Sequence, residues 1–242
     1  MASVREHYDN HLGKFYTWML GDFIKQKDDF KHFCIHHGIR PATNARAADL
    51  GCGNGVQTIA LAELGFSVIA IDFNKKLLED LHHHAGKLPL EIIEADFRQF
   101  PAYLHGGLEL IVCGGDTLTH LVSFDEIHKL IQDAYVKLSV KGKIVLTFRD
   151  YSRELTDVDR FIPVRNDTNR ILTCFLEYFS DSVRVTDLLH ERVDGEWTQK
   201  ISSYHKLRLT DNFVLDSLVQ AGFKIFTHTT WNGFSALIAG KA

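Results

Sequence analysis

Short apolar runs alternate with longer amphipathic stretches between residues 46 and 149. A short apolar run bounded by turn residues is typical of a buried strand, whereas apolar residues at three- and four-residue spacing are typical of a helix. Strands are expected at 46–50, 67–71, 90–94, 108–113 and 143–149, and helices at 56–64, 74–85 and 125–138. This alternation predicts a parallel sheet with crossover helices.

Both flanks of this core have a different pattern. Residues 3–38 carry aromatic residues at helical spacing, interrupted near Gly21, which predicts two helices. After residue 150 the chain is β-rich, and Asp194-Gly195 predicts a tight turn. We therefore expect an antiparallel insertion of about three strands. The later elements are expected as insertion strands at 170–179, 183–193 and 197–209, a helix at 211–221, and final strands at 223–228 and 234–239.

Composition narrows the function classes. With 242 residues, 45% of them apolar, the chain can bury a core as one domain. A net charge of −4 without a basic cluster argues against nucleic acid or an anionic membrane as a partner. The first residues lack the apolar core of a signal peptide. The four cysteines are scattered without a CxxC pair, so we expect neither zinc nor disulfides, and a cytoplasmic location.

The segment Asp49–Gly55 reads Asp-Leu-Gly-Cys-Gly-Asn-Gly and joins the first expected strand to a helix. Glycine permits positive φ and lets a ligand approach the main chain without meeting a Cβ. Seventeen residues after Gly55, the second strand ends on Asp72. A glycine turn followed by an acid in this position is how doubly wound sheets hold an adenosine-type cofactor, with the acid on the ribose hydroxyls.

Two nucleoside cofactors fit such a turn. The dinucleotide fingerprint is Gly-x-Gly-x-x-Gly, but this chain has Gly-x-Gly-x-Gly at Gly51, Gly53 and Gly55. A nicotinamide-dependent oxidoreductase is therefore the less favoured alternative. The pattern with Asp49 in front resembles motif I of the class I S-adenosylmethionine-dependent methyltransferases.

Ligands of doubly wound sheets bind beyond the carboxyl ends of the strands. That rule also nominates 96–97, 114–120 and 149–151. Asp116 supplies a polar group there, and it is alternatively the N-cap of the turn that follows. The run His82-His83-His84 falls on a helix, where adjacent side chains diverge. We expect a solvated helix face from this run, and no metal site.

The resemblance implies roles for these residues. In the family an acid after the third strand bonds the adenine amine, and a neighbouring aromatic residue packs on the ring. The residues expected to bind the cofactor S-adenosylmethionine are Tyr16, Asp49, Gly51, Gly53, Gly55, Asp72, Phe73, Asp96, Phe97 and Gly114.

Four segments narrow the resemblance to the glycine/sarcosine N-methyltransferase branch: 49–55, 94–97, 113–121 and 148–151. In that branch the arginine that matches Arg149 binds the substrate carboxylate. Asp116 departs from the branch, which has asparagine there, and its charge would repel a carboxylate unless a cation lies between them. We therefore do not expect glycine as the substrate.

The resulting hypothesis is methyl transfer to a small-molecule acceptor, most simply an amine nitrogen of an amino-acid-like metabolite. An O-methyltransferase and a non-catalytic adenosylmethionine-binding module are the alternatives. Asp116, His120 and Arg149 are the expected catalytic residues. The expected substrate-binding residues are Tyr8, Asp116, Arg149, Tyr151 and Tyr204.

The expected fold is α/β, a doubly wound Rossmann-like sheet of about seven strands whose last pair is reversed. We expect a single domain over 1–242, and homo-oligomers are compatible with it. Its expected parts are an N-terminal helical lid (1–40), a cofactor-binding core (41–150), an antiparallel insertion lining the substrate site (151–209), and a C-terminal helix with the final strand pair (210–242).

Overall fold

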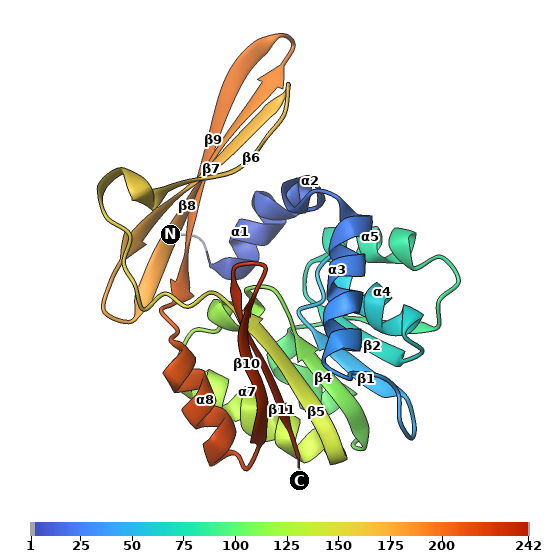
Figure 1. Ribbon diagram of the computed structural model, residues 1–242. Helices are drawn as coiled ribbons and strands as arrows, with labels where there is room; N and C mark the ends of the chain where they lie inside the picture. The colour runs from blue at the N-terminus through green and yellow to red at the C-terminus, as the bar shows by residue number, and fades with distance from the viewer. Residues whose placement is uncertain (1–2, 242) are drawn as a thin grey trace.

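The computed structural model describes residues 3–241, which form two sheets with helices around one of them (Figure 1). The central sheet has the strand order β10-β11-β5-β4-β1-β2-β3. Its strands are β1 (Arg46–Leu50), β2 (Ser67–Asp72), β3 (Leu90–Glu94), β4 (Leu108–Cys113), β5 (Leu138–Phe148), β10 (Lys224–Trp231) and β11 (Phe234–Gly240). Strands β1 to β5 pair in parallel, so their carboxyl ends meet at one edge. This confirms the expected α/β fold.

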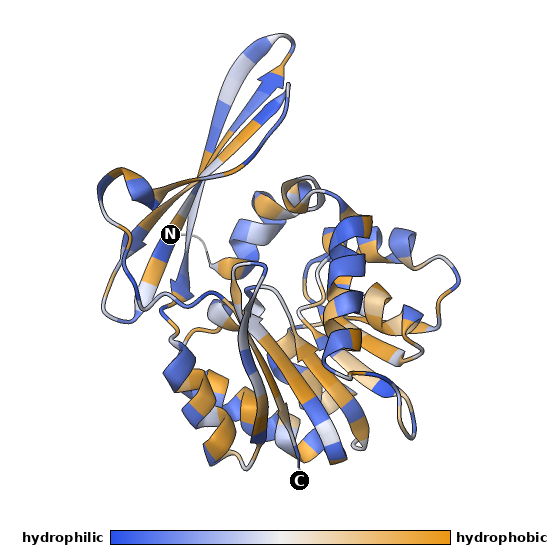
Figure 2. Cartoon of the chain, in the orientation of Figure 1, coloured by the Kyte–Doolittle hydropathy of each residue, from blue (hydrophilic) through white to orange (hydrophobic). Residues whose placement is uncertain are grey.

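Helices cover both faces of the central sheet. They are α3 (Phe23–His36), α4 (Val56–Glu63), α5 (Lys75–Ala85), α6 (Phe100–Tyr103), α7 (Phe124–Lys137) and α8 (Asp211–Gln220). One core cluster joins strand residues such as Ile111 to Ile131 of α7 and Leu218 of α8. Another joins the opposite face to Phe30 of α3 and Leu61 of α4. Strands β2 and β4 are hydrophobic along most of their length because helices cover both faces of the sheet there, whereas the edge strand β10 is mostly polar (Figure 2).

The end of the chain refines one expectation. Strand β11 runs antiparallel to both of its neighbours, β5 and β10. The reversal in the last pair therefore belongs to β11, while β10 has the direction of β5.

The N-terminal region contains three α-helices where two were expected. These are α1 (Val4–Asn10), α2 (Tyr16–Leu20) and α3, with a 3₁₀ turn η1 (Leu12–Lys14) after α1. Ser3 and Glu6 form a capping box that starts α1. Gly21, at φ 89°, ends α2, and Asp22 caps α3 by accepting a hydrogen bond from the Lys25 amide. The expected break at Gly21 is confirmed, and the second break lies near His11.

The insertion after β5 is an antiparallel sheet of four strands, not about three. Its order is β6 (Phe161–Asn166), β7 (Arg170–Tyr178), β8 (Ser182–Val193) and β9 (Glu196–Leu207). The missed strand β6 contains Pro163 and lies at the edge, where proline is tolerated. The turn at Asp194-Gly195 is confirmed, since both residues have positive φ between paired strands.

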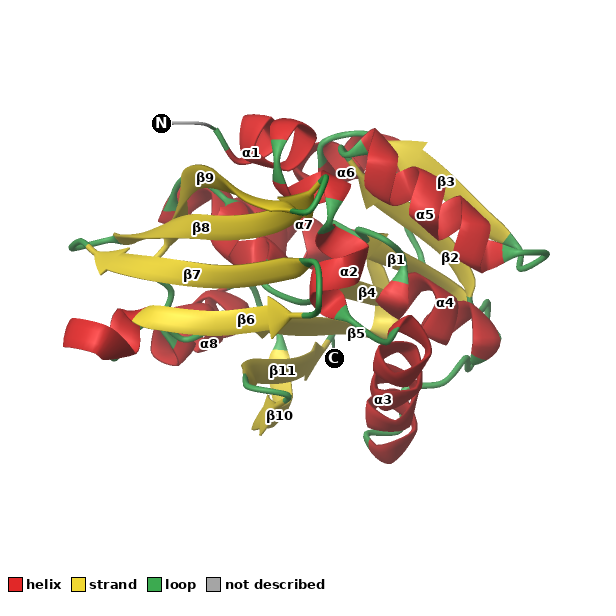
Figure 3. Ribbon diagram, turned by 90° about the horizontal axis from the view of Figure 1, so that it is seen from above, coloured by secondary structure: helices red, strands yellow, loops and turns green. Residues whose placement is uncertain are grey.

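The insertion sheet lies beside the carboxyl edge of the central sheet, with α1 and α2 next to it (Figure 3). Alternation along its strands gives the sheet two faces. Leu176, Val185 and Tyr204 are on the face toward the body of the protein and are buried there. In residues 3–241 no helix combines the length and apolar character that crossing a membrane requires.

Candidate active site

The glycine turn after β1 depends on residues that have no Cβ. Gly51 and Gly55 have φ values of 69° and 93°. A Cβ on Gly51 would lie 2.3 Å from Cγ2 of Thr117, and one on Gly55 would lie 2.2 Å from Cδ1 of Leu81. Gly53 differs, because the nearest atom to its Cβ would be Cε1 of Tyr16 at 3.7 Å. The backbone at Gly53 is thus open toward the N-terminal segment.

Asp72 ties the end of β2 to this turn. Its Oδ2 accepts a 2.9 Å hydrogen bond from the amide of Gly53, and its Oδ1 accepts one of 2.8 Å from the amide of Asn74. Burial raises the pKa of the Asp72 carboxyl. Asp72 lines a narrow cavity of about 30 Å³ together with other predicted residues. Those residues are Tyr8, Tyr16, Gly51, Gly53, Phe73, Phe97 and His120.

Three of the residues that were predicted to contact the cofactor are not in the wall of this cavity, nor in the wall of the larger cavity that extends to the insertion. Asp49 is buried behind the turn, where its Oδ2 accepts a 2.6 Å bond from Thr58 and burial raises its pKa to about 7. Gly55 packs against Leu81. The carboxylate of Asp96 pairs with the guanidinium of Arg98. Asp49 and Gly55 support the turn, and an adenine contact by Asp96 stays a prediction.

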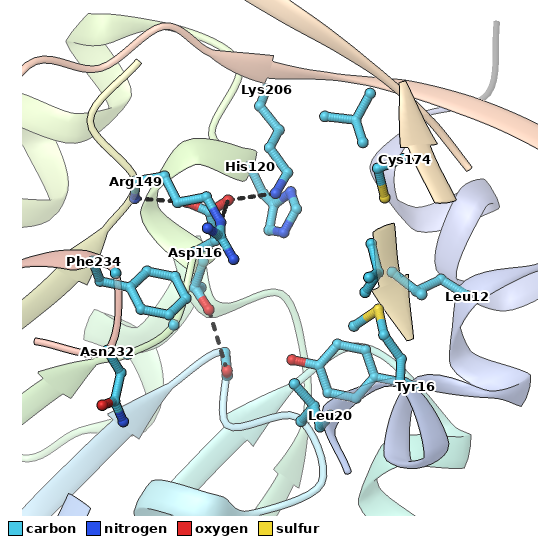
Figure 4. A pocket seen from close by; sticks show the side chains of 18 of the residues that line it. Leu12, Tyr16, Leu20, Asp116, His120, Arg149, Cys174, Lys206, Asn232 and Phe234 are labelled. Atoms are coloured by element: carbon cyan, nitrogen blue, oxygen red, sulfur yellow. Dashed lines mark hydrogen bonds and ion pairs between the residues drawn. The ribbon is translucent and has the colours of Figure 1, made fainter. Parts of the chain in front are cut away.

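A cavity of about 860 Å³ extends from the glycine turn to the insertion (Figure 4). The predicted residues that it brings together are Tyr8, Tyr16, Gly51, Gly114, Asp116, His120, Arg149, Tyr151 and Tyr204. His120 lines both cavities, as do Tyr8, Tyr16 and Gly51. The two cavities therefore adjoin at these four residues.

Asp116 accepts hydrogen bonds from three groups in the wall of the large cavity. The donors are Nζ of Lys206 at 2.5 Å, the amide of Arg149 at 3.0 Å and the hydroxyl of Tyr151 at 3.2 Å. Burial opposes ionisation, but Lys206 and the Arg149 amide outweigh it and lower the pKa of Asp116 to about 2. The alternative of a side-chain N-cap is wrong, because Asp116 makes no capping bond to the 3₁₀ turn η3 (Thr117–His120).

Lys206 was missed by the sequence reasoning. It lies on β9, is 9% exposed, and its ammonium points to Asp116 (Figure 4). The sequence did contain a signal for Lys206. Tyr204 was an expected substrate-binding residue, and residues two positions apart on a strand lie on the same face of the sheet. The charge pairing was not visible, because 90 positions separate the two partners.

His120 is held as a neutral imidazole. Its Nε2 lies 3.3 Å from the hydroxyl of Tyr8, and its buried Nδ1 has no partner among residues 3–241. Burial, and then the charge of Lys206, lower the pKa of His120 to about 3. His120 is therefore uncharged at neutral pH and acts there as a hydrogen-bonding group.

Arg149 stands at the open side of the same cluster. Its side chain is 52% exposed, its Cζ lies 4.7 Å from the centre of the Phe234 ring, and its Nε lies 3.8 Å from Oδ2 of Asp116. The guanidinium donates no hydrogen bond to the described residues. Its N–H groups are thus available to a ligand in the cavity.

The N-terminal segment is fastened to both sides of the site. Thr17 donates a 2.6 Å bond to Asp80 and accepts one of 3.3 Å from Asn54 in the glycine turn. On the insertion side, Nε2 of His7 lies 3.1 Å from Asp187. These contacts place Tyr8 and Tyr16 in the cavity walls. A lid role stays a prediction.

The histidine run is mostly solvated. His82 and His83 are exposed, as expected of a helix face. His84 is an exception, since its Nδ1 lies 3.0 Å from the carbonyl oxygen of Asn54 and its ring stacks on Phe23. His84 therefore helps to support the glycine turn.

Comparison with curated proteins identifies a domain within this chain. Residues 47–142 match the family model described as a methyltransferase domain. The chain is 28% identical to the glycine/sarcosine N-methyltransferase of Halorhodospira halochloris over 108 residues, which are 44% of this chain and 40% of that protein. It is 39% identical to the ubiquinone biosynthesis O-methyltransferase of Pelagibacter ubique over 70 residues, 29% of each chain. Each match thus spans less than half of the relative.

Solved structures give a match over nearly the whole chain. The SAM-bound amino pentose methyltransferase CalS10 of Micromonospora echinaspora superposes with a TM-score of 0.74 at 17% identity, covering 93% of this chain and 94% of that one. At this identity the likeness shows the fold. Residues 47–142 thus match a methyltransferase domain, and the chain has the fold of S-adenosylmethionine-dependent methyltransferases.

Proposed function

We propose that this chain is an enzyme that transfers a methyl group from S-adenosylmethionine to a small-molecule acceptor. The observation that carries the proposal is the junction of the two cavities. One lies beside Asp72 and the glycine turn, and the other extends from that turn to the insertion. A methyltransferase has to bring two ligands into contact, and this junction offers a place for each.

The residues of the narrow cavity have the chemistry to hold the donor, and we call Gly51–Gly55, Asp72 and Phe97 the donor end. Each oxygen of Asp72 keeps a lone pair beyond those used by Gly53 and Asn74. A volume of about 30 Å³ has room for a few water molecules but not for a nucleoside. The side chains of Tyr8 and Tyr16 therefore have to move outward when a nucleoside enters. When bound, adenosylmethionine supplies an electrophilic methyl group on its sulfonium.

The chain's own residues position the acceptor and exclude water. Asp116 already accepts hydrogen bonds from three donors, and with a pKa of about 2 it stays ionised at neutral pH and is a poor general base. His120, with a pKa of about 3, is too weak a base to deprotonate an ammonium group. The acceptor must therefore arrive with a free lone pair. Alignment of the two ligands then lowers the barrier, by about 7–11 kcal/mol in well-oriented reactions.

An amine nitrogen of an amino-acid-like metabolite is the acceptor that we favour. The name of the Halorhodospira relative supports nitrogen, and that of the Pelagibacter relative supports the alternative, oxygen. The negative charge of Asp116 is balanced by Lys206, with which it forms an ion pair, so Asp116 is not expected to repel a carboxylate. A carboxylate-bearing acceptor is therefore compatible with this site.

A direct test begins with calorimetry on the purified chain. We expect uptake of adenosylmethionine, and loss of that uptake in Asp72→Ala but not in the control Asp133→Ala. Asp133 is a carboxylate on α7 that pairs with Lys129 at the surface. Uptake of a nicotinamide cofactor without uptake of adenosylmethionine would refute the proposal.

Transfer of a labelled methyl group separates an enzyme from a binding module. The purified chain is incubated with labelled donor and separate pools of amino acids, amines and phenols. We expect label in the amine-containing pools. Label in the phenols alone would replace nitrogen by oxygen, and donor uptake with no transfer into any pool or metabolite extract would favour the binding module.

A further inference from the structure

Lys206 and Arg149 give the large cavity two cations on the side that faces the insertion. Both lie within 3.8 Å of the same oxygen, Oδ2 of Asp116. Asp116 is one charge, so this cluster, which we call the acceptor end, has one positive charge in excess. Figure 4 shows Asp116 between the two cations, with His120 beside Lys206. Lys206 is buried and Arg149 is half exposed, so the excess positive charge lies at the open side of the cavity, where it favours an anionic ligand.

The hydrogen-bonding groups of the acceptor end lead to the same ligand. An ammonium has three N–H donors, and Asp116 is the single acceptor that residues 3–241 supply to Nζ of Lys206. The cavity's carboxylates have donors of their own. Asp187 is 3.1 Å from both His7 Nε2 and Cys174 Sγ, and Asp150 accepts from two amides. Lys206 and Arg149 therefore both keep N–H groups that donate to no acceptor among residues 3–241, and such groups match an oxyanion.

Two further parts of the cavity wall are apolar. On the insertion side lie Leu155, Ile162, Leu176 and Val185, and on the N-terminal side lie Leu12, Met19 and Leu20. A volume of about 860 Å³ is near the upper end of the range of about 300–1,000 Å³ found for pockets that hold drug-sized ligands. Glycine would leave these walls without a contact.

We infer that the acceptor is an amphipathic molecule whose oxyanion, a carboxylate or a phosphate, is bound by Lys206 together with Arg149, while its apolar body lies along the insertion. This inference rests on the proposed function and names its substrate class. Lys206 is then a specificity-determining residue supplied by β9. The insertion provides both the charge and the apolar wall, so it selects the acceptor.

A pair of fluorescent probes with the same aromatic body tests the inference. Anilinonaphthalene sulfonate carries an oxyanion, and N-phenylnaphthylamine lacks it. We expect the sulfonate to bind the purified chain at least about tenfold more tightly than the neutral probe. In Lys206→Met the sulfonate should lose at least about tenfold in affinity while the neutral probe is unaffected, since a charged hydrogen bond is lost. Naphthoate and naphthyl phosphate as competitors then distinguish carboxylate from phosphate.

Matched variants keep this test decisive. Lys200→Met removes an exposed lysine of the same strand, paired with Glu191, and should leave both affinities unchanged. Lys206→Arg keeps the charge and should retain the sulfonate. If Lys206→Met does not fold, Asp116→Asn/Lys206→Met removes both charges together. Equal affinity for the two probes in the parent chain, or no selective loss on removing Lys206, overturns the inference. Calorimetry with adenosylmethionine on the same samples shows separately whether the proposed function fails.

Discussion

The donor end and the acceptor end of the site are built in different ways. The donor end comes from residues 51–97, on adjacent parallel strands, and it depends on backbone conformation and amide hydrogen bonds. The acceptor end joins Asp116, Arg149 and Lys206 from two different sheets through charged side chains. A site that is formed by backbone conformation tolerates few substitutions. A site that is formed by side chains on an insertion can change its ligand through substitutions while the fold stays the same.

The largest effect should come from Lys206→Met. Removing one partner of a buried ion pair costs about 3–5 kcal/mol. We expect a loss of unfolding free energy near the lower value, because the side chains of Lys206 and Asp116 remain 10% and 12% exposed. Urea unfolding at neutral pH measures it. Asp116→Asn/Lys206→Met should recover most of the loss, and Lys200→Met should stay within about 0.5 kcal/mol of the parent.

The ion pair between Lys206 and Asp116 also predicts how the free energy of unfolding changes with pH. The pKa of Asp116 in the folded chain, about 2, is below its value in an unfolded chain, about 3.9. Its contribution to stability is therefore present above pH ~4 and is lost as the pH falls toward 2. In Lys206→Met the pKa should rise, so the stability difference from the parent should shrink in acid. A difference that is constant with pH would contradict this account.

A smaller effect, confined to the donor end, is expected from Asp72→Asn. An amide oxygen can replace one carboxylate oxygen but not both, so the bonds to Gly53 and Asn74 cannot both persist. With charged hydrogen bonds contributing about 1.5–3 kcal/mol each, adenosylmethionine should bind about 10–100-fold more weakly by calorimetry. Affinity for anilinonaphthalene sulfonate should not change. If Asp72→Asn lowered the affinities for both ligands equally, the donor end and the acceptor end would not be separate sites.

Two alanine substitutions sharpen the backbone argument. Gly51→Ala combines positive φ with a Cβ only 2.3 Å from Cγ2 of Thr117, whereas the Cβ of Gly53→Ala, also at positive φ, has no atom nearer than 3.7 Å. Left-handed backbone costs about 1–2 kcal/mol and overpacking a further 1–3 kcal/mol. Urea unfolding should therefore find Gly51→Ala less stable than Gly53→Ala by about 1–3 kcal/mol. Equal stabilities would show that Thr117 moves away at no cost.

The smallest effect concerns His120. With a pKa of about 3, its imidazole should show no titration by NMR between pH 5 and 8, with the signal assigned through His120→Gln. Because Lys206 is one cause of the low pKa, and the charge of Asp116 acts in the opposite direction, Lys206→Met should raise the pKa of His120. The pH dependence of kcat/KM should then follow ionisation of the acceptor and not of His120. A titration near pH 6.5 would make His120 a candidate base again.

Much of the core was predictable because its signals are local. The expected strands at 46–50, 90–94 and 108–113 have the observed bounds, since each is a short segment rich in apolar residues that is bounded by turn residues. The edge strand β6 was missed because Pro163 and exposed side chains hide its pattern. The N-terminal helices were undercounted because Gly13, which lies in η1 between α1 and α2, was not used as a helix-break signal.

The sequence by itself determined the parallel sheet, the glycine turn and the acid at the end of β2, because apolar periodicity and glycine φ preferences act over a few residues. The pairing of Lys206 with Asp116, and the position of Asp49 behind the turn, depend on how distant parts of the chain pack together. A charge on one strand selects its partner by distance in space, and the distance between residues 90 positions apart follows from how two sheets pack.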